Sequence, residues 1–258
     1  MSYLSKMLES TRERVAEAKE RVSVDALEQR LAGIPEPASL RAALTGPEVA
    51  VIAEIKRASP SAGVFDANLN ATETARAYAR GGAAAISVVT EPEFFRGSLD
   101  DLTSARSAGL PVVRKDFILD TWQVLESRAA GADALLLIVR ILEQEALRTL
   151  LAACATLRMD ALVEVYDRDE LNRAVDAGAR VVGVNNRDLE TYEVDRDRTL
   201  RLAPQVPEGV TAVGLSGVSS RADVEALAEA GAGAVLVGEA LVRARDPAAK
   251  LLELRGVS

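Results

Sequence analysis

Residues 174–184 read AVDAGARVVGV, and three other stretches repeat the same phrase: ARGGAAAISVV at 79–89, RAAGADALLLI at 128–138 and LAEAGAGAVLV at 227–237. Each stretch combines the end of an amphipathic helix, a glycine suited to the position after the helix C-cap, and a short apolar run. Glycine takes the left-handed conformation of that position at little cost. The apolar run that follows is typical of a strand buried on both faces, as in a parallel sheet.

The spacing of these four phrases predicts eight strands rather than four. Their glycines lie about 50 residues apart, roughly twice the length of one strand–helix unit, so a further unit should lie between each pair. Strand-like runs lie before or between the phrases at Val49–Arg57, Pro111–Ile118, Asp160–Tyr166 and Val210–Ser216. Strands that alternate with helices form parallel sheets, and eight such units predict an α/β fold closed into a (β/α)8 TIM barrel. An open doubly wound sheet is the alternative, although no G-x-G-x-x-G motif opens the first unit.

The first 45 residues stand outside this repeat. Leu4, Met7, Leu8, Val15, Ala18 and Val22 follow helical spacing, and Pro35 and Pro37 then break the pattern. A chain of 258 residues has the usual length of one barrel. We therefore expect one domain, residues 1–258, with a helical extension over 1–45 and the barrel over 46–258. The charged face of the extension is typical of solvated surface, and we assign no chemistry to it.

Composition excludes several classes of function. A net charge of −8 argues against a nucleic-acid surface but leaves room for a local basic pocket for a small anion. There is no histidine, so the commonest general base and zinc ligand are missing, and acid–base chemistry must use Lys, Glu, Asp or Tyr. The single cysteine, Cys154, has the neighbours of a core residue rather than of a nucleophile. Charges interrupt the N-terminal segment early, so we expect no signal peptide, no membrane span and a cytoplasmic protein.

Charged residues occupy positions where the barrel interior should be apolar. Side chains alternate between the two faces of a strand, and this period turns Glu54, Lys56, Lys115, Glu164 and Asn185 inward. All lie near the carboxyl ends of their strands, where barrel enzymes build their active sites. Two lysines facing two glutamates are neutral overall and supply an acid and a base without histidine. The alternative is a purely structural ion-pair plug, in which the charges only neutralise one another.

Glycine turns follow the last two strands. Ser216 and Gly217 end the seventh strand, and Gly238 and Glu239 follow the eighth at a predicted helix start. Free backbone amides at these two turns form the usual phosphate site of such barrels. The pattern predicts a phosphorylated small-molecule substrate.

Six segments resemble the indole-3-glycerol-phosphate synthase family of tryptophan biosynthesis. They are IAEIKRASPSAG (52–63), SVVTEPEFFRGS (87–98), VRKDFI (113–118), LVEVYD (162–167), GVNNRDLET (183–191) and VLVGEALVR (235–243). The resemblance covers essentially the whole chain. It implies a carboxy-lyase that closes 1-(2-carboxyphenylamino)-1-deoxyribulose 5-phosphate to an indole with loss of carbon dioxide and water, and it implies no metal and no organic cofactor.

The resemblance also implies a role for each matching residue. Lys115 would be the general acid on the substrate carbonyl, and Glu164 its partner in later proton transfer. Lys56 would hold the substrate carboxylate and assist dehydration, while Glu54 orients Lys56. The substrate-binding residues would be Asn185 for the sugar hydroxyls, Phe95 and Phe117 for the anthranilate ring, and Ser59, Ser216, Gly217, Gly238 and Glu239 for the phosphate.

The chain departs from the family pattern at Leu215, where the family usually carries a glutamate before Ser-Gly. Ala62 and Tyr166 likewise replace a usual basic residue and a common histidine. Leu215 supports one alternative, a weakened paralogue that only binds a phosphorylated ligand. A barrel like phosphoribosylanthranilate isomerase is the other, but its first strand would need a cysteine or equivalent base. For the assembly we expect a monomer or a weak homodimer.

Overall fold

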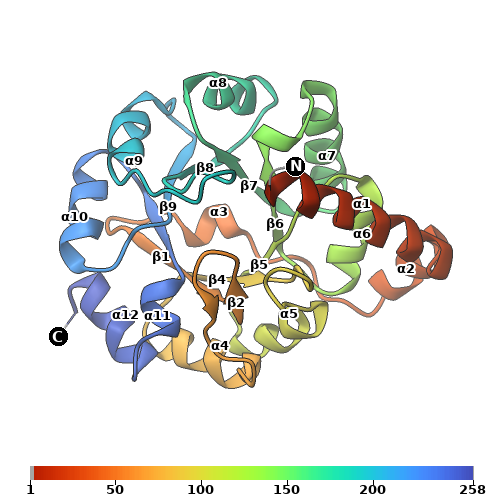
Figure 1. Cartoon of the computed structure of the whole chain (residues 1–258), viewed down its shortest axis with the longest axis horizontal. Helices are drawn as coiled ribbons and strands as arrows, with labels where there is room; N and C mark the ends of the chain where they lie inside the picture. The colour runs from red at the N-terminus through yellow and green to blue at the C-terminus, as the bar shows by residue number, and fades with distance from the viewer. Residues whose placement is uncertain (1–2, 258) are drawn as a thin grey trace.

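Eight parallel strands close into a barrel in the computed structural model, which describes residues 3–257 (Figure 1). Each strand pairs with the next one along the chain, and the last strand pairs with the first. The barrel strands are β1 (Ala50–Ile55), β4 (Ala85–Val89), β5 (Val112–Lys115), β6 (Ala134–Ile138), β7 (Asp160–Val165), β8 (Val181–Asn185), β9 (Thr211–Leu215) and β10 (Ala234–Val237). Closure confirms the predicted barrel and shows that the open-sheet alternative is wrong.

Helices connect the strands and form the outer ring of Figure 1. The α-helices of the barrel are α4 (Ala71–Arg80), α5 (Leu99–Ala105), α6 (Thr121–Ala129), α7 (Gln144–Thr156), α8 (Arg168–Asp176), α9 (Asp197–Leu202), α10 (Arg221–Glu229), α11 (Glu239–Val242) and α12 (Pro247–Arg255). Three 3₁₀ turns join them, η1 (Arg106–Ala108), η2 (Val139–Ile141) and η3 (Ala203–Gln205). Within residues 3–257 no helix has the length and apolar character needed to cross a bilayer.

The helix-ending glycines of the four repeated phrases behave as predicted. Gly82, Gly131, Gly178 and Gly231 each follow a helix C-cap and have φ between +79° and +95°. A side chain at this backbone conformation would be strained, which explains why the same residue recurs before four strands.

A small hairpin after β1 was not predicted. Its strands are β2 (Ala58–Ser59) and β3 (Gly63–Val64), which pair antiparallel outside the barrel. Two-residue strands carry too little periodicity to be distinguished from a loop in the sequence.

The strands separate two apolar clusters. Outward residues such as Val51, Ala53 and Ile55 of β1 pack under the helices, whereas Ile52 packs inside the barrel. The predicted alternation is therefore confirmed on β1, and the same division holds on β7 and β8. Cys154 lies in the outer cluster, and burial raises the pKa of its thiol to about 12, as expected of a core residue.

The extension contributes three helices, α1 (Tyr3–Arg21), α2 (Val24–Leu31) and α3 (Leu40–Ala43). The shortest, α3, closes the amino-terminal end of the barrel and lies at the centre of the ring in Figure 1. Leu40 and Leu44 join the inner cluster, and Asp160 at the start of β7 accepts hydrogen bonds from the Ser39 hydroxyl and the Arg41 amide, both at 2.9 Å.

The opposite end of the barrel is partly covered by α1. Its Leu4 and Met7 join the same inner cluster as Phe117, which follows β5. Tyr3 packs edge-on against Phe94 and Tyr192, with ring centroids 6.4 and 5.8 Å apart. The extension therefore touches both ends of the barrel.

We predict that the extension is part of the barrel core rather than an appendage. Leu40 is fully buried, so Leu40→Ala should lower the free energy of unfolding by about 2–5 kcal/mol, the range for large-to-small core substitutions. The matched control is Val24→Ala, at an exposed position of α2, which should change it by no more than about 0.5 kcal/mol. Urea unfolding of both variants checks this, and equal, small effects would contradict it.

Candidate active site

A cavity of about 460 Å³ opens at the carboxyl-terminal ends of the strands. All of the site residues predicted from the sequence line it: Glu54, Lys56, Ser59, Phe95, Lys115, Phe117, Glu164, Asn185, Ser216, Gly217, Gly238 and Glu239. They come from β1, β5, β7, β8 and the segments after β1, β4, β5, β9 and β10. Tertiary structure thus brings together residues that are up to 185 positions apart in the chain.

Glu54 and Lys56 form an ion pair at the end of β1, with 2.8 Å between Lys56 Nζ and Glu54 Oε1. The Glu54 side chain is only 5% exposed. Burial alone would raise the pKa of its carboxyl, but the positive charges of Lys56 and Lys115 and the hydrogen bond from Lys56 outweigh it and hold the pKa below its usual value. Glu54 is therefore ionised at neutral pH and fixes the position of the Lys56 ammonium.

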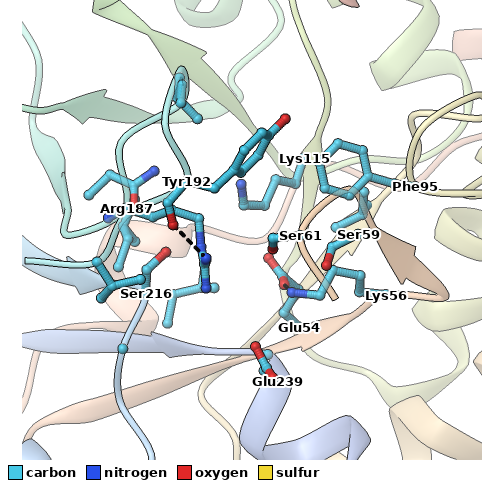
Figure 2. Close-up of a pocket in the computed structure, with 18 of the residues that line it drawn as sticks. Glu54, Lys56, Ser59, Ser61, Phe95, Lys115, Arg187, Tyr192, Ser216 and Glu239 are labelled. Carbon is cyan, nitrogen blue, oxygen red and sulfur yellow. Dashed lines mark hydrogen bonds and ion pairs between the residues drawn. The ribbon is translucent and has the colours of Figure 1, made fainter. Parts of the chain in front are cut away.

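Lys115 ends β5 and extends into the same space as Lys56 (Figure 2). Its charge acts on Glu54, but unlike Lys56 it has no carboxylate oxygen within ion-pair distance among residues 3–257. The mouth is therefore a cavity with a free ammonium group, and an ion-pair plug does not describe it. A free, partly buried cation in such a cavity can bind an anion or donate a proton.

Glu164 and Asn185 lie side by side on β7 and β8. Asn185 Nδ2 donates to Glu164 Oε1 at 2.9 Å, and Asn185 Oδ1 accepts from the Arg187 amide at 3.0 Å. The second carboxylate oxygen, Glu164 Oε2, is buried and has no hydrogen-bond partner in the described part of the chain. Because an unpartnered buried oxygen is costly, it is the natural acceptor for a donor group on a ligand.

The turn after β9 presents its backbone to the cavity. Ser216 and Gly217 both have positive φ, +64° and +84°, and Asn186 Nδ2 donates to the Ser216 carbonyl at 3.1 Å. Such a conformation is strained for serine and is characteristic of functional turns. Ser216, Gly217, Val218 and Ser219 of this turn all line the cavity.

Gly238 fits its position because it lacks a side chain. A Cβ there would come within 2.3 Å of Glu54 Oε1 and 3.1 Å of Lys56 Nζ. The first backbone amides of α11, which have no partner within the helix, therefore begin directly beside the Glu54–Lys56 pair.

Apolar groups form the other wall. Phe117 is almost completely buried in the inner cluster, and Phe94 and Phe95 pack against that cluster. Leu215 ends β9, is 2% exposed and sits close to Gly183, where an added Cβ would meet its Cδ1 at 2.7 Å. The position at which the sequence departs from the family is thus an apolar part of the cavity wall.

Several cavity residues were not predicted. They include Glu91, Arg187, Tyr192, Arg196 and Arg243. Arg187 lies within the N-x-R-D-L segment, and its guanidinium donates to the Tyr192 carbonyl at 3.0 Å, which holds it at the rim of the cavity (Figure 2). Arg187 follows Asn185 by two residues, so the strand period could have predicted that it also faces the cavity. Arg196 lies in a loop and Arg243 follows a helix, so no strand period could have predicted their positions.

Glu91 organises the loop that carries Phe95. Its carboxylate accepts the backbone amides of Glu93, Phe94 and Phe95 at 3.1, 2.7 and 3.0 Å. Burial raises the pKa of this carboxyl, and the three amide hydrogen bonds oppose the increase. Phe95 is consequently held by a buried acid as well as by its packing against the inner cluster.

Tyr166 lies outside the cavity. Its ring is stacked between the guanidinium groups of Arg140 and Arg198, 3.9 and 3.5 Å from the ring centre. Arg198 in turn donates to the Asn185 and Asn186 carbonyls. The tyrosine that replaces the common histidine therefore stabilises Arg198 and, through it, the β8–α9 loop, and it does not line the cavity.

Comparisons with known proteins agree on one family. The family model described as indole-3-glycerol phosphate synthase matches residues 4–254. Proteins with that name from Mycolicibacterium vanbaalenii and Mycobacterium avium are 50% and 49% identical over 254 residues, which cover 98% of this chain and 93% of each relative. Among solved structures, 3-hexulose-6-phosphate synthase from Salmonella typhimurium aligns with a TM-score of 0.64 at 15% identity, covering 81% of this chain and 97% of that one, a likeness of fold alone.

We predict that Lys56 keeps Glu54 ionised and thereby stabilises the fold above acidic pH. In Lys56→Met burial remains while the attracting charge is lost, so the pKa of Glu54 should rise. A depressed carboxyl pKa contributes stability that is present above the unfolded value, about 4.3, and is lost as pH falls through the folded value. The loss of unfolding free energy in Lys56→Met should therefore be greatest near pH 7 and shrink toward pH 4.

Urea unfolding at several pH values measures this loss. The control is Lys6→Met, an exposed lysine on α1, which should show no such trend. A loss for Lys56→Met that is independent of pH would contradict the assignment.

Proposed function

The chain belongs to the indole-3-glycerol phosphate synthase family, and we propose here which of its side chains carry out the family's reaction. It is a carboxy-lyase of tryptophan biosynthesis that converts 1-(2-carboxyphenylamino)-1-deoxyribulose 5-phosphate to indole-3-glycerol phosphate, carbon dioxide and water. The family assignment favours this activity over an isomerase-like barrel.

Ring closure requires an acid at the substrate carbonyl and a cation at the substrate carboxylate. Lys115 is the proposed acid, because its ammonium is unpaired and lies in the cavity. Lys56 is the proposed carboxylate partner, since Glu54 fixes its position at 2.8 Å. As the aromatic carbon attacks the carbonyl carbon, Lys115 protonates the carbonyl oxygen, and decarboxylation then restores the aromatic ring.

Dehydration requires a second proton transfer. Glu164 is proposed for this step, because its Oε2 is buried and unpartnered while Asn185 holds Oε1. Asn185 is also the proposed contact for the sugar hydroxyls. The aromatic wall of Phe95 and Phe117 supports binding of the anthranilate ring beside these polar groups.

The substrate phosphate is assigned to the turns after β9 and β10. Ser216 and Gly217 supply one turn, and Gly238 and Glu239 supply the other, at the start of α11. Ser59, on β2, lines the same cavity and is the proposed hydroxyl contact. The cationic Arg243 lines it as well and adds to the attraction for a dianion.

The unpaired Lys115 in the cavity is the observation on which these roles chiefly depend. Lys115→Ala should lower kcat by about 10² or more, the range for loss of general acid catalysis. Fluorescence detection of indole-3-glycerol phosphate formed from the carboxyphenylamino substrate measures this. Lys250→Ala, a lysine on α12 outside the cavity, serves as the control, and near-normal kcat in Lys115→Ala would exclude the assignment.

Variants at position 215 test whether the missing glutamate weakens turnover, as expected of a relative that only binds its ligand. A carboxylate at position 215 would add a negative charge to the cavity and help to keep Lys56 and Lys115 protonated, so Leu215→Glu should raise kcat. It should also lower thermal stability, because a charged group replaces a packed apolar side chain. Leu215→Gln, similar in size but uncharged, is the matched control and should not raise kcat. Unchanged kcat in Leu215→Glu would show that the missing charge is not limiting, and tight product binding without turnover in the parent chain would favour the binding-only alternative.

A further inference from the structure

Asp116 lies between Lys115 and Phe117 in the wall of the cavity, and its side chain is completely buried. A buried carboxylate is costly unless it is fully hydrogen-bonded and paired with charge. The groups that contact Asp116 therefore show how its buried negative charge is stabilised.

The barrel supplies three of the groups that bind the Asp116 carboxylate. Thr90 Oγ1 donates at 2.7 Å, Arg114 Nη2 donates at 3.1 Å and the Phe117 amide donates at 2.9 Å. Arg114 is itself 2% exposed and forms a second ion pair with Glu126 at 2.8 Å. These contacts fix the backbone on both sides of Asp116 where β5 ends.

The extension supplies the fourth group. Arg14 of α1 places Nη2 3.2 Å from Asp116 Oδ1 and Nη1 3.4 Å from Oδ2. Burial would raise the pKa of Asp116, but the Arg114 and Arg14 charges outweigh it, so the carboxyl has a lowered pKa. Arg14 and Arg114 together face the carboxylates of Asp116 and Glu126, with Glu91 also close enough to act on Arg14, and this set of charges is complete only when α1 is docked.

We propose that Asp116 is a positioning residue for Lys115 and Phe117, and that Arg14 makes this positioning depend on docking of the N-terminal helix. The inference rests on the proposed role of Lys115. A displacement of about 1 Å at a reacting group can cost on the order of 10²-fold in rate. Loss of Arg14 leaves Arg114 alone to balance Asp116 and Glu126 and removes one of the groups that hold the Asp116 carboxylate, so a small displacement at the end of β5 should affect turnover more than binding.

The test compares Arg14→Met with Lys19→Met. Both remove a cation of α1 that pairs with the β5–α6 region, but Lys19 pairs with Asp120, an exposed pair at the N-cap of α6. At a temperature where circular dichroism shows both variants folded, Arg14→Met should lower kcat by about 10-fold or more with KM within about 2-fold. Lys19→Met should retain kcat within about 2-fold.

Two further variants separate positioning from general destabilisation. Arg14→Lys keeps the charge and should restore kcat in part. Asp116→Asn should lower kcat alone, and adding Arg14→Met to it should cause little further loss, because the two residues act through one contact.

The inference is overturned if Arg14→Met retains kcat within about 2-fold of the parent chain, if Lys19→Met loses as much as Arg14→Met, or if the Arg14 and Asp116 effects are fully additive. These outcomes differ from failure of the proposed function. Normal turnover in Lys115→Ala would remove the role of Lys115 itself, whereas normal turnover in Arg14→Met beside an inactive Lys115→Ala would overturn only the positioning.

Discussion

Closure of eight parallel strands brings all eight carboxyl-terminal ends to one rim, and the rest of this structure depends on that geometry. Residues that follow different strands meet there without any local contact along the chain. The inner cluster fills the barrel below them, so the inward-facing charges Glu54, Lys56, Lys115 and Glu164 gather at the mouth. The chemistry therefore depends on how the charges at this rim are paired.

Pairing at the rim is unequal. Glu54 and Lys56 neutralise one another, Glu164 has one oxygen bound by Asn185, and Lys115 has no carboxylate partner among the described residues. Full pairing would give a stable but inert plug. The Lys115 ammonium and the unpartnered Glu164 oxygen instead leave an acid and an acceptor facing the same cavity.

The extension adds a second constraint. It closes the amino-terminal end of the barrel through Leu40 and Leu44 and reaches the opposite end through α1. Arg14 contacts the buried Asp116 next to Lys115. The extension, predicted from its helical spacing of apolar residues to pack on the barrel, is thus joined to the core and to the edge of the active site.

The sequence by itself determined the fold, because the repeated helix–glycine–strand phrase, with its continuous apolar run, is a local pattern that reports burial directly. It also determined which residues face inward, since a period of two leaves no freedom once one face is buried. Tertiary structure alone decided that Lys115 has no ion-pair partner among the described residues, that Glu91 holds the Phe95 loop, and that Arg14 meets Asp116. The Arg14–Asp116 contact joins residues 102 positions apart, and the Glu91 contacts lie in a loop. No period applies at either place, so only the packed fold fixes the distances.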